Sequence, residues 1–175
     1  MAIQNQQQPV LIQDCAEYHY SRCRSLWVEL TQHHCLIYQD PTIGGSDPGK
    51  RLDSYLANPS RCATWVAEAG GRVVGLCGLL LRGEEAEVEP VIVATGFRSR
   101  GVGRALVEHA VRHARSLGVR FLSVRPVARN AQAISFFLRC GFDVVGQIDL
   151  FQDLKPETGR TWKSGLVIHG HNLMY

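Results

Sequence analysis

The sequence lacks the signals of several special classes of protein. Its six cysteines include no C-x-x-C pair, so neither a zinc site nor a redox pair is indicated. No apolar run approaches the length that spans a membrane, and the N-terminus, MAIQNQQQPV, has no apolar signal core. We therefore expect a cytoplasmic protein with reduced thiols and no membrane partner, whose residues 1–8 are disordered.

A strong charge of either sign is also missing. The 175 residues carry a net charge of +3, and 45% of them are hydrophobic and 20% charged, as in ordinary globular domains. This charge gives no reason to expect nucleic acid as a partner. Most arginines lie between Arg98 and Arg139, which favours a local anion site. No repeat or linker divides the chain, so we expect a single domain.

The N-terminal part predicts a short strand and a long helix. Residues 10–12 are apolar and read as the strand. Asp14 and Glu17 have the spacing of a capping box, and the helix is expected to run from there to about His34. Its apolar face is formed by Cys23, Leu26, Trp27 and Leu30.

A long loop rich in glycine and proline follows the helix. Residues 38–49 read YQDPTIGGSDPG, and their two Asp-Pro steps mark irregular structure. A loop of this length is either functional or a plain surface excursion. Asp47-Pro48 is expected to cap a short helix that extends through Leu56.

The rest of the chain predicts strands that are first antiparallel and then joined through helices. Residues 63–69 and 73–81 form a hairpin through Gly70-Gly71, and residues 88–93 form the next strand. Helices are expected over residues 105–117 and 130–139. The remaining predicted segments are strands at 119–124 and from 142 to about 154, a polar turn at 155–164 and a last strand at 165–175. This order favours a mixed α/β sheet with helices on its faces.

The turn at residues 98–103, RSRGVG, joins a buried strand to a helix. The first N–H groups of a helix have no partner within it, and the helix dipole adds partial positive charge there. Such a turn attracts phosphate, and Gly101 and Gly103 would let it approach the backbone. The alternative is a simple tight turn. Neither the dinucleotide-binding fingerprint nor the P-loop pattern fits these residues.

Together with the residues that follow, this turn gives the sequence a family resemblance. The chain contains Arg98-x-x-Gly101-x-Gly103, then a helix, a strand, Asn130, a short helix and Gly141-Phe142. In this order it resembles the GNAT superfamily of acyl-CoA-dependent N-acyltransferases, most strongly over residues 63–154. The family's pyrophosphate signature is Arg or Gln, two free positions, Gly, one free position, then Gly or Ala.

The resemblance implies a GNAT-like fold with a central mixed sheet, acetyl-CoA as the acyl donor, and no metal. The amide of Val93 or Ala94 would face the thioester carbonyl. Asn130 would contact the pantetheine arm or stabilise its loop, unless it is only a helix N-cap. The cofactor-binding residues that the resemblance implies are Val91, Ile92, Val93, Arg98, Ser99, Arg100, Gly101, Val102, Gly103, Arg104, Asn130 and Phe137.

The sequence departs from the family at two positions. Phe137 stands where many members carry a tyrosine that protonates the departing thiolate, and phenylalanine cannot do so. Tyr38, Tyr55, Tyr175, His169, His171 or water are other candidate acids. Pro90 falls inside a central strand although proline removes a ladder donor, so we expect a bulge or a strand splay there.

Glu87 and Glu89 are the candidate catalytic bases. A primary amine is mostly protonated near neutral pH, and a carboxylate can take its proton directly or through water. The two residues are two apart on one strand, so both side chains point to the same face. The alternative is a solvated acidic strand edge, since Glu84 and Glu85 precede them.

The function implied by the resemblance is transfer of an acetyl group to a primary amine, by direct attack in a ternary complex. The alternatives are a catalytically silent acyl-CoA sensor and an unrelated nucleotide-binding protein. The acceptor stays open among peptides, polyamines, amino acids and small amines, although the acidic residues 84–89 would suit a cation. The last strand either extends the sheet or pairs with a second subunit. His109 and His113 read as helix surface, and His33 as a helix end or a substrate contact.

Overall fold

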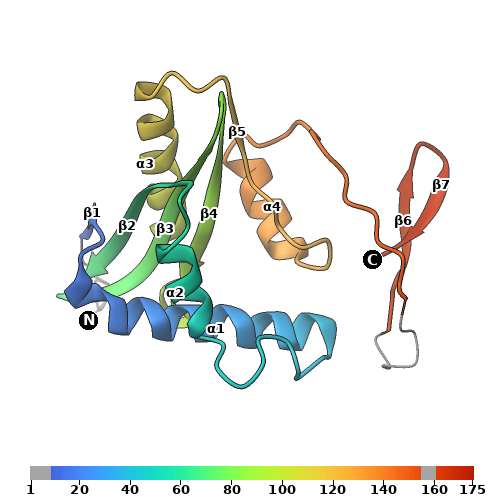
Figure 1. Cartoon of the computed structure of the whole chain (residues 1–175), viewed down its shortest axis with the longest axis horizontal. Helices are drawn as coiled ribbons and strands as arrows, with labels where there is room; N and C mark the ends of the chain where they lie inside the picture. Colours follow the sequence, from blue (N-terminus) through green and yellow to red (C-terminus); the bar gives the residue numbers. More distant parts are fainter. Residues whose placement is uncertain (1–8, 155–160) are drawn as a thin grey trace, which may run out of the picture.

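The computed structural model describes residues 9–154 and 161–175, and its centre is a five-stranded sheet with the strand order β1-β2-β3-β4-β5 (Figure 1). The first four strands pair antiparallel, and β5 pairs parallel to β4. The mixed sheet expected from the sequence is therefore confirmed. The strands are β1 Val10–Asp14, β2 Arg61–Ala69, β3 Arg72–Arg82, β4 Glu85–Val93 and β5 Phe121–Ser123.

Helices cover both faces of this sheet. On one face α1 and α2 pack over the apolar cluster that contains Leu26, Trp27, Leu52 and Leu76. On the other face α3 packs over a second cluster with Leu106 and Ala110 at its centre. The helices are η1 Glu17–His19, α1 Tyr20–Tyr38, α2 Lys50–Leu56, η2 Thr95–Phe97, α3 Val102–Ser116 and α4 Ala131–Arg139.

The predicted caps of the first two helices are wrong, although the helices themselves exist. Asp14 is the last residue of β1, and its pairing with Trp65 removes it from the helix start. The helix α1 continues four residues past His34 to Tyr38, where Gln39 adopts a left-handed conformation with φ 53°. The N-cap of α2 is Gly49, and no side chain caps it.

The C-terminal part differs most from the sequence prediction. β5 has only three residues, and residues 143–154 form no strand because no neighbouring strand pairs with them. The predicted last strand is instead a hairpin of β6 Ser164–Ile168 and β7 His171–Met174, which turns at His169 and Gly170. Figure 1 shows this hairpin apart from the sheet. Residues 1–8 and most of the predicted polar turn, 155–160, lie outside the described residues.

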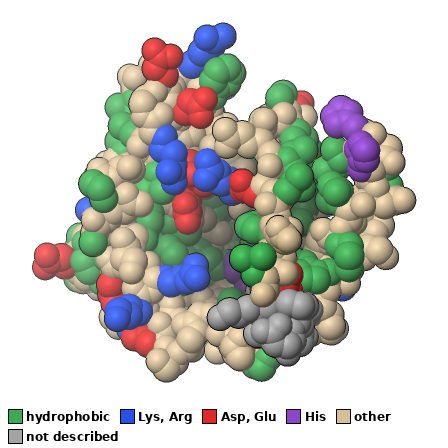
Figure 2. All heavy atoms as spheres, turned by 45° about the vertical axis from the view of Figure 1, so that its right-hand side comes forward, with side chains coloured by type: hydrophobic (Ala, Val, Ile, Leu, Met, Phe, Trp, Pro, Cys, Tyr) green, Lys and Arg blue, Asp and Glu red, His purple; other side chains and the backbone are tan. Residues whose placement is uncertain are grey.

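Large apolar side chains are exposed along this C-terminal part. Phe151 is 82% exposed and Val144 is 87% exposed. Figure 2 shows apolar side chains gathered on the right of the molecule, below two histidines. Arg129 attaches the hairpin to the body, since its side chain donates to the carbonyl oxygens of Tyr175 and Thr161. Within the described residues, no helix is long and apolar enough to cross a membrane.

Candidate active site

The turn before α3 presents backbone N–H groups at the start of a helix. Gly101 is left-handed with φ 82°, a conformation that costs glycine little. The first helical hydrogen bond runs from the Ala105 N–H to the Gly101 oxygen at 2.9 Å. The N–H groups of Val102, Gly103 and Arg104 therefore have no acceptor within the helix, and the helix dipole favours an anion beside them.

The three arginines of the turn have different surroundings. The Arg98 Nε donates to the Val93 oxygen at 3.1 Å, which attaches the turn to the end of β4. The Arg100 guanidinium lies over the Phe97 ring, 5.4 Å from its centroid. Arg104 points along the helix to Glu108, with 2.8 Å between Nε and Oε1. Arg98 and Arg100, unlike Arg104, form no ion pair with the described residues.

The outer edge of β4 is open beside this turn. β5 pairs with β4 only at residues 85–87, and no other described strand lies along β4 beyond them. The Ala94 N–H donates to the Val74 oxygen at 2.8 Å, so it is not available to a thioester. Backbone groups of an antiparallel strand alternate in direction, so those of Val93 and Val91 point away from β3 and those of Ile92 point toward it.

Asn130 and the aromatic residues of α4 lie across from the turn. The Asn130 Oδ1 accepts the Ala133 N–H at 3.0 Å, so the N-cap role of Asn130 is confirmed. A Cβ atom added at Gly103 would lie 3.3 Å from the Phe136 ring, so this ring of α4 lies against the first turn of α3. Phe137 packs between Phe136 and Phe142, with ring centroids 5.1 and 5.9 Å away.

His33 joins this group from α1, and the sequence left its role open. Partial burial lowers the pKa of His33, and the nearby Arg98 charge lowers it further, whereas a hydrogen bond with the Asn130 side chain opposes both effects. The imidazole thus lies near Arg98 of the turn and the Asn130 N-cap of α4. This proximity could not be predicted, because His33 is far from Arg98 and Asn130 along the chain.

A β-bulge shapes β4 next to the two candidate bases, as Pro90 led us to expect. Cys77 pairs with Val91 and Leu79 with Val88, so Gly78 alone faces both Glu89 and Pro90. A Cβ atom at Gly78 would overlap the Tyr55 hydroxyl and lie 2.5 Å from the Glu89 oxygen. Only glycine therefore fits between α2 and the bulge.

Glu87 and Glu89 share a face of β4 but have different partners. Their neighbours Ala86 and Val88 pack in the cluster under α3, which directs both glutamates to the α1–α2 face. Glu87 is 3% exposed and pairs with Arg82 at 3.1 Å and with Arg125 at 3.5 Å. This pairing compensates the charge of Glu87, one of the four glutamates that the sequence places within residues 84–89.

Glu89 lines a cavity of about 340 Å³ between α1, α2 and the sheet. Partial burial raises the pKa of Glu89, and the charge of Glu87 raises it further, while three arginines oppose these effects. A carboxylate with a raised pKa is a better proton acceptor than one with its ordinary pKa. The cavity is lined by Trp27, Arg51, Ser54, Tyr55, Asn58, Leu80 and Glu89.

The other candidate acids lie in different parts of the fold. The Tyr55 hydroxyl lies 3.0 Å from the Thr64 Oγ1, and burial raises the pKa of Tyr55 to about 12. The Tyr38 ring lies under Arg129, with 4.7 Å to the guanidinium carbon. Tyr175, His169 and His171 belong to the C-terminal hairpin region, where the Tyr175 carbonyl accepts from Arg129. His109 and His113 pack edge-on against Trp65.

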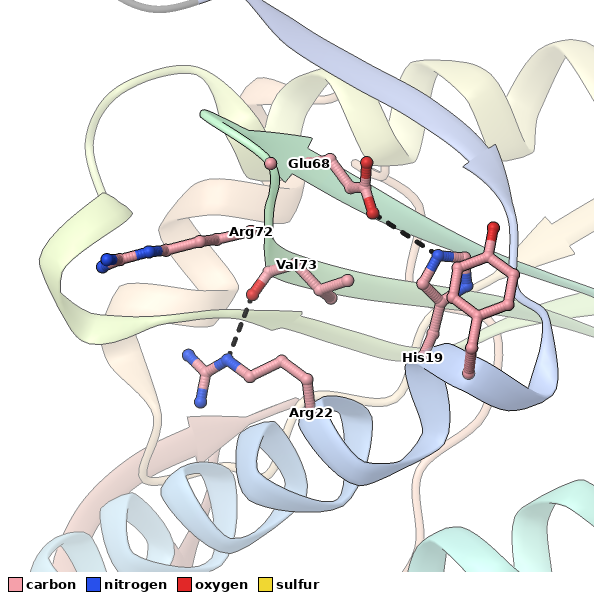
Figure 3. A pocket seen from close by; sticks show the side chains of 7 residues that line it. His19, Arg22, Glu68, Arg72 and Val73 are labelled. Carbon is pink, nitrogen blue, oxygen red and sulfur yellow. Dashed lines mark hydrogen bonds and ion pairs between the residues drawn. The ribbon is translucent and has the colours of Figure 1, made fainter.

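A second cavity, of about 440 Å³, lies at the turn between β2 and β3 (Figure 3). Its buried His19 accepts the Ala16 N–H at Nδ1, so Nε2 carries the proton and faces Glu68 at 3.4 Å. Arg22 donates to the Val73 oxygen at 3.1 Å. These contacts hold the start of α1 to the hairpin, which is a structural role.

Comparison with known proteins identifies the family. Residues 27–142 match the family model described as the acetyltransferase (GNAT) family. The chain belongs to the GNAT acetyltransferase family. The RxxGxG turn, the open edge of β4 and the N-cap of α4 therefore lie in a GNAT domain, as the sequence resemblance implied.

Curated relatives and solved structures agree with this assignment. Streptothricin acetyltransferase from Streptomyces lavendulae is 33% identical over 114 residues, which are 63% of this chain and 59% of the relative. An uncharacterised N-acetyltransferase of Methanocaldococcus jannaschii is 31% identical over 113 residues, which are 53% of this chain and 50% of the relative. The chain thus spans little more than half the length of these relatives.

The fold is that of a CoA-bound acetyltransferase structure. The aminoglycoside N-acetyltransferase AAC(6')-Iy in complex with CoA superposes with a TM-score of 0.65, covering 86% of this chain and 98% of that one. The ribosomal-protein-S18-alanine N-acetyltransferase from Escherichia coli gives a TM-score of 0.57, covering 76% and 77%. Both are only 16% identical to this chain, so the likeness concerns the fold alone.

Proposed function

We propose that this protein transfers an acetyl group from acetyl-CoA to a primary amine, by direct attack within a ternary complex. The observation that carries the proposal is that the RxxGxG turn and the open edge of β4 lie one bulge away from the Glu89 cavity. A donor site and an acceptor site on the same strand are what a direct transfer requires. Membership of the GNAT family supports the same reaction class.

The residues of the turn fit the diphosphate of acetyl-CoA. Helix-start N–H groups and Arg98 and Arg100 supply the donors and the positive charge that a diphosphate needs. Ser99 to Arg104 would contact it through the backbone. Val91 and the Val93 N–H offer the open strand edge to the pantetheine arm, while the Val93 oxygen already accepts from Arg98, and Asn130 and Phe137 would border the arm. The Val93 N–H is our candidate for the thioester carbonyl.

Glu89 is our candidate for the general base, rather than Glu87. Glu87 is paired with two guanidinium groups, whereas Glu89 opens into the cavity and has a raised pKa. Glu89 would take a proton from the acceptor's ammonium, directly or through water, and the free amine would attack the thioester carbonyl carbon. The C–N bond forms, the nitrogen loses its second proton to solvent, and the C–S bond breaks; the departing thiolate takes a proton from solvent, since Phe137 has none to give.

A catalytically silent acyl-CoA-binding protein is the second candidate, because Phe137 occupies the position of the expected proton donor. The two functions differ in turnover but not in donor binding. Binding and turnover must therefore be measured on the same preparation.

Calorimetry with acetyl-CoA, followed by an assay of thiol release across an amine panel, tests the proposal. We expect binding by the parent and at least about a hundredfold weaker binding by the Arg98→Ala, Gly101→Glu double variant. The variant loses one guanidinium group, and its added carboxylate would repel the diphosphate at the turn. An Arg115→Gln variant, changed at the far end of α3, serves as the control. Equal binding by the double variant and the parent would refute the donor site, and binding without turnover would favour the silent protein.

We also propose that the protein is a cytoplasmic homodimer whose C-terminal parts contact each other. All six cysteines are free, which suits a reducing compartment. Nine large apolar side chains of residues 144–174 are exposed. If each presents an area on the order of 100 Å², together they match the roughly 800 Å² that one partner contributes to a standard interface.

Light scattering after size exclusion tests the dimer. We expect twice the chain mass for the parent and a single chain mass for a Val145→Glu, Phe151→Glu variant, because charges would be placed in the apolar interface. A monomeric parent would refute the dimer without affecting the proposed transfer.

A further inference from the structure

The cavity beside Glu89 is small and carries one charge of each sign. Its volume of about 340 Å³ lies at the lower end of the roughly 300 to 1,000 Å³ of small-molecule sites. Trp27, Tyr55 and Leu80 form the apolar part of its wall, and the Trp27 and Tyr55 rings lie 5.7 Å apart. Such a space suits a molecule of amino-acid size better than an oligosaccharide.

Arg51 is the cation of this cavity. It projects from α2, and its guanidinium forms no hydrogen bond or ion pair with the described residues, although it lies near enough to Glu89 to lower the pKa of that carboxyl. Asp47 and Asp53, the carboxylates nearest to Arg51 in the sequence, both pair with Arg24 and not with Arg51. Arg51 therefore remains available to an anionic group of a ligand.

The charges around the cavity do not favour a polycation. Glu89 and Glu87 are the two carboxylates, and Arg51, Arg82 and Arg125 are the three guanidinium groups near them. Figure 2 shows basic and acidic side chains next to one another above the middle of the face drawn. A molecule with several ammonium groups would meet repulsion from the arginines and find only one free carboxylate.

We propose that the acceptor is an amine that also carries a carboxylate, with the amine at Glu89 and the carboxylate at Arg51. The inference rests on the proposed transfer reaction and names its substrate class. A carboxylate matches the paired donors of a guanidinium, and the contact orients the amine toward β4. An amino acid is the smallest member of this class, whereas a polyamine is excluded from it.

Two acceptors that differ in this carboxylate, and through it in the pKa of the amine, test the inference. With the full chain and saturating acetyl-CoA, kcat/KM is measured for leucine, leucinamide and spermidine and is expressed per concentration of unprotonated amine. The parent is expected to prefer leucine to leucinamide by about tenfold or more, as one charge-assisted contact allows. Arg51→Gln should lower that ratio about tenfold and Arg51→Lys should restore part of it. Because the amine pKa of each acceptor is the same in every variant, it cancels when the ratios are compared.

Arg115→Gln, on the exposed end of α3, is the matched control and should keep the parent's ratio. The inference is overturned if the parent prefers leucinamide or spermidine, or if Arg51→Gln leaves the ratio unchanged. Either result leaves the transfer reaction standing. If acetyl-CoA binds and none of the three acceptors gives thiol release while another amine of the panel does, this inference alone fails; if no amine of the panel does, the proposed function fails with it.

Discussion

The two halves of the candidate site are built in different ways. The half that we assign to acetyl-CoA, formed by residues 91–104 and the start of α4, consists mainly of backbone: the α3 N-terminus, the left-handed Gly101 and the free edge of β4. The half that we assign to the acceptor is a cavity of side chains from α1, α2, β3 and β4. We call them the donor half and the acceptor half.

This difference shows where specificity can change. A donor that is the same in every reaction is suitably bound by backbone groups, which side-chain substitutions hardly alter. An acceptor half made of side chains can be altered one residue at a time while the sheet is kept. In this chain the side chains beside the candidate base Glu89 are Arg51 and the Arg82–Glu87–Arg125 group.

Glu89→Gln should break the acceptor half while leaving the donor half intact. We expect kcat to fall by roughly 10²- to 10⁴-fold, the usual contribution of a general base, with acetyl-CoA binding unchanged. The parent's rate should rise with pH at an apparent pKa above 4.5, in the direction in which partial burial shifts Glu89, and the variant should lose this rise. Initial rates across pH, with calorimetry for the donor, give both readings.

Glu87→Gln is the matched control. Its carboxylate is buried and paired, so the loss should appear as about 1 to 2 kcal/mol of stability, reduced by the half-exposed arginines, and as little change in rate. Glu89→Gln should show the opposite result, a large loss of rate with little loss of stability. Because folding raises the pKa of Glu89, its stabilising contribution is present at low pH and is lost as pH rises through the folded pKa; the Gln variant lacks that loss. A rate loss confined to Glu87→Gln would reverse our assignment.

Gly78→Ala should damage the boundary between the halves. The added methyl group would meet the Tyr55 hydroxyl and the Glu89 backbone, so either α2 or the bulge must move. We expect a loss of about 1 to 3 kcal/mol of stability, as in overpacked cores, and a fall of about tenfold in kcat/KM for the acceptor. Chemical denaturation and steady-state kinetics measure these effects.

The matched control is Gly96→Ala in η2, where a Cβ atom meets no other group within 4 Å. It should leave the stability nearly unchanged. If Gly78→Ala behaves like this control, the close contact between Tyr55 and the bulge does not shape the acceptor half.

The donor half was predictable from the sequence because it is contiguous. The strand, the glycine turn and the helix lie within residues 88–117, and each follows from local patterns of apolar residues and glycines. The place of Asn130 at the start of α4 was also predictable, and its side chain is the N-cap there. Which of the two N–H groups, Val93 or Ala94, is free to face the thioester carbonyl was not predictable, because the direction of the Ala94 N–H depends on its partner Val74 in β3.

The acceptor half was not predictable, since it depends on long-range pairing. Nothing local shows that Arg125 reaches Glu87 or that Arg51 shares a cavity with Glu89. The bulge also reverses the alternation of side chains along β4. It places the Ile92 side chain on the α1–α2 face and the Val93 side chain on the α3 face. The predicted strand beyond Phe142 failed for the same reason: apolar residues extend a sheet only where an edge is available to pair with them.

Phe137→Tyr should have the smallest effect, and it examines the donor half where the chain departs from its family. The ring is half-buried between Phe136 and Phe142, so a hydroxyl at its edge should be tolerated. A thiol with a pKa of about 8.5 leaves readily without an acid, so we expect kcat to change by no more than about threefold. Phe142→Tyr adds the same hydroxyl to the same cluster and is the control.

A gain of tenfold or more in kcat for Phe137→Tyr alone, with unchanged acetyl-CoA binding, would contradict this expectation, because it would mean that the missing acid limits the reaction. Turnover that begins only with the tyrosine would go further, since the parent would then be the silent binding protein. A small effect would instead mean that solvent protonates the thiolate, which the open edge of β4 beside the turn would allow.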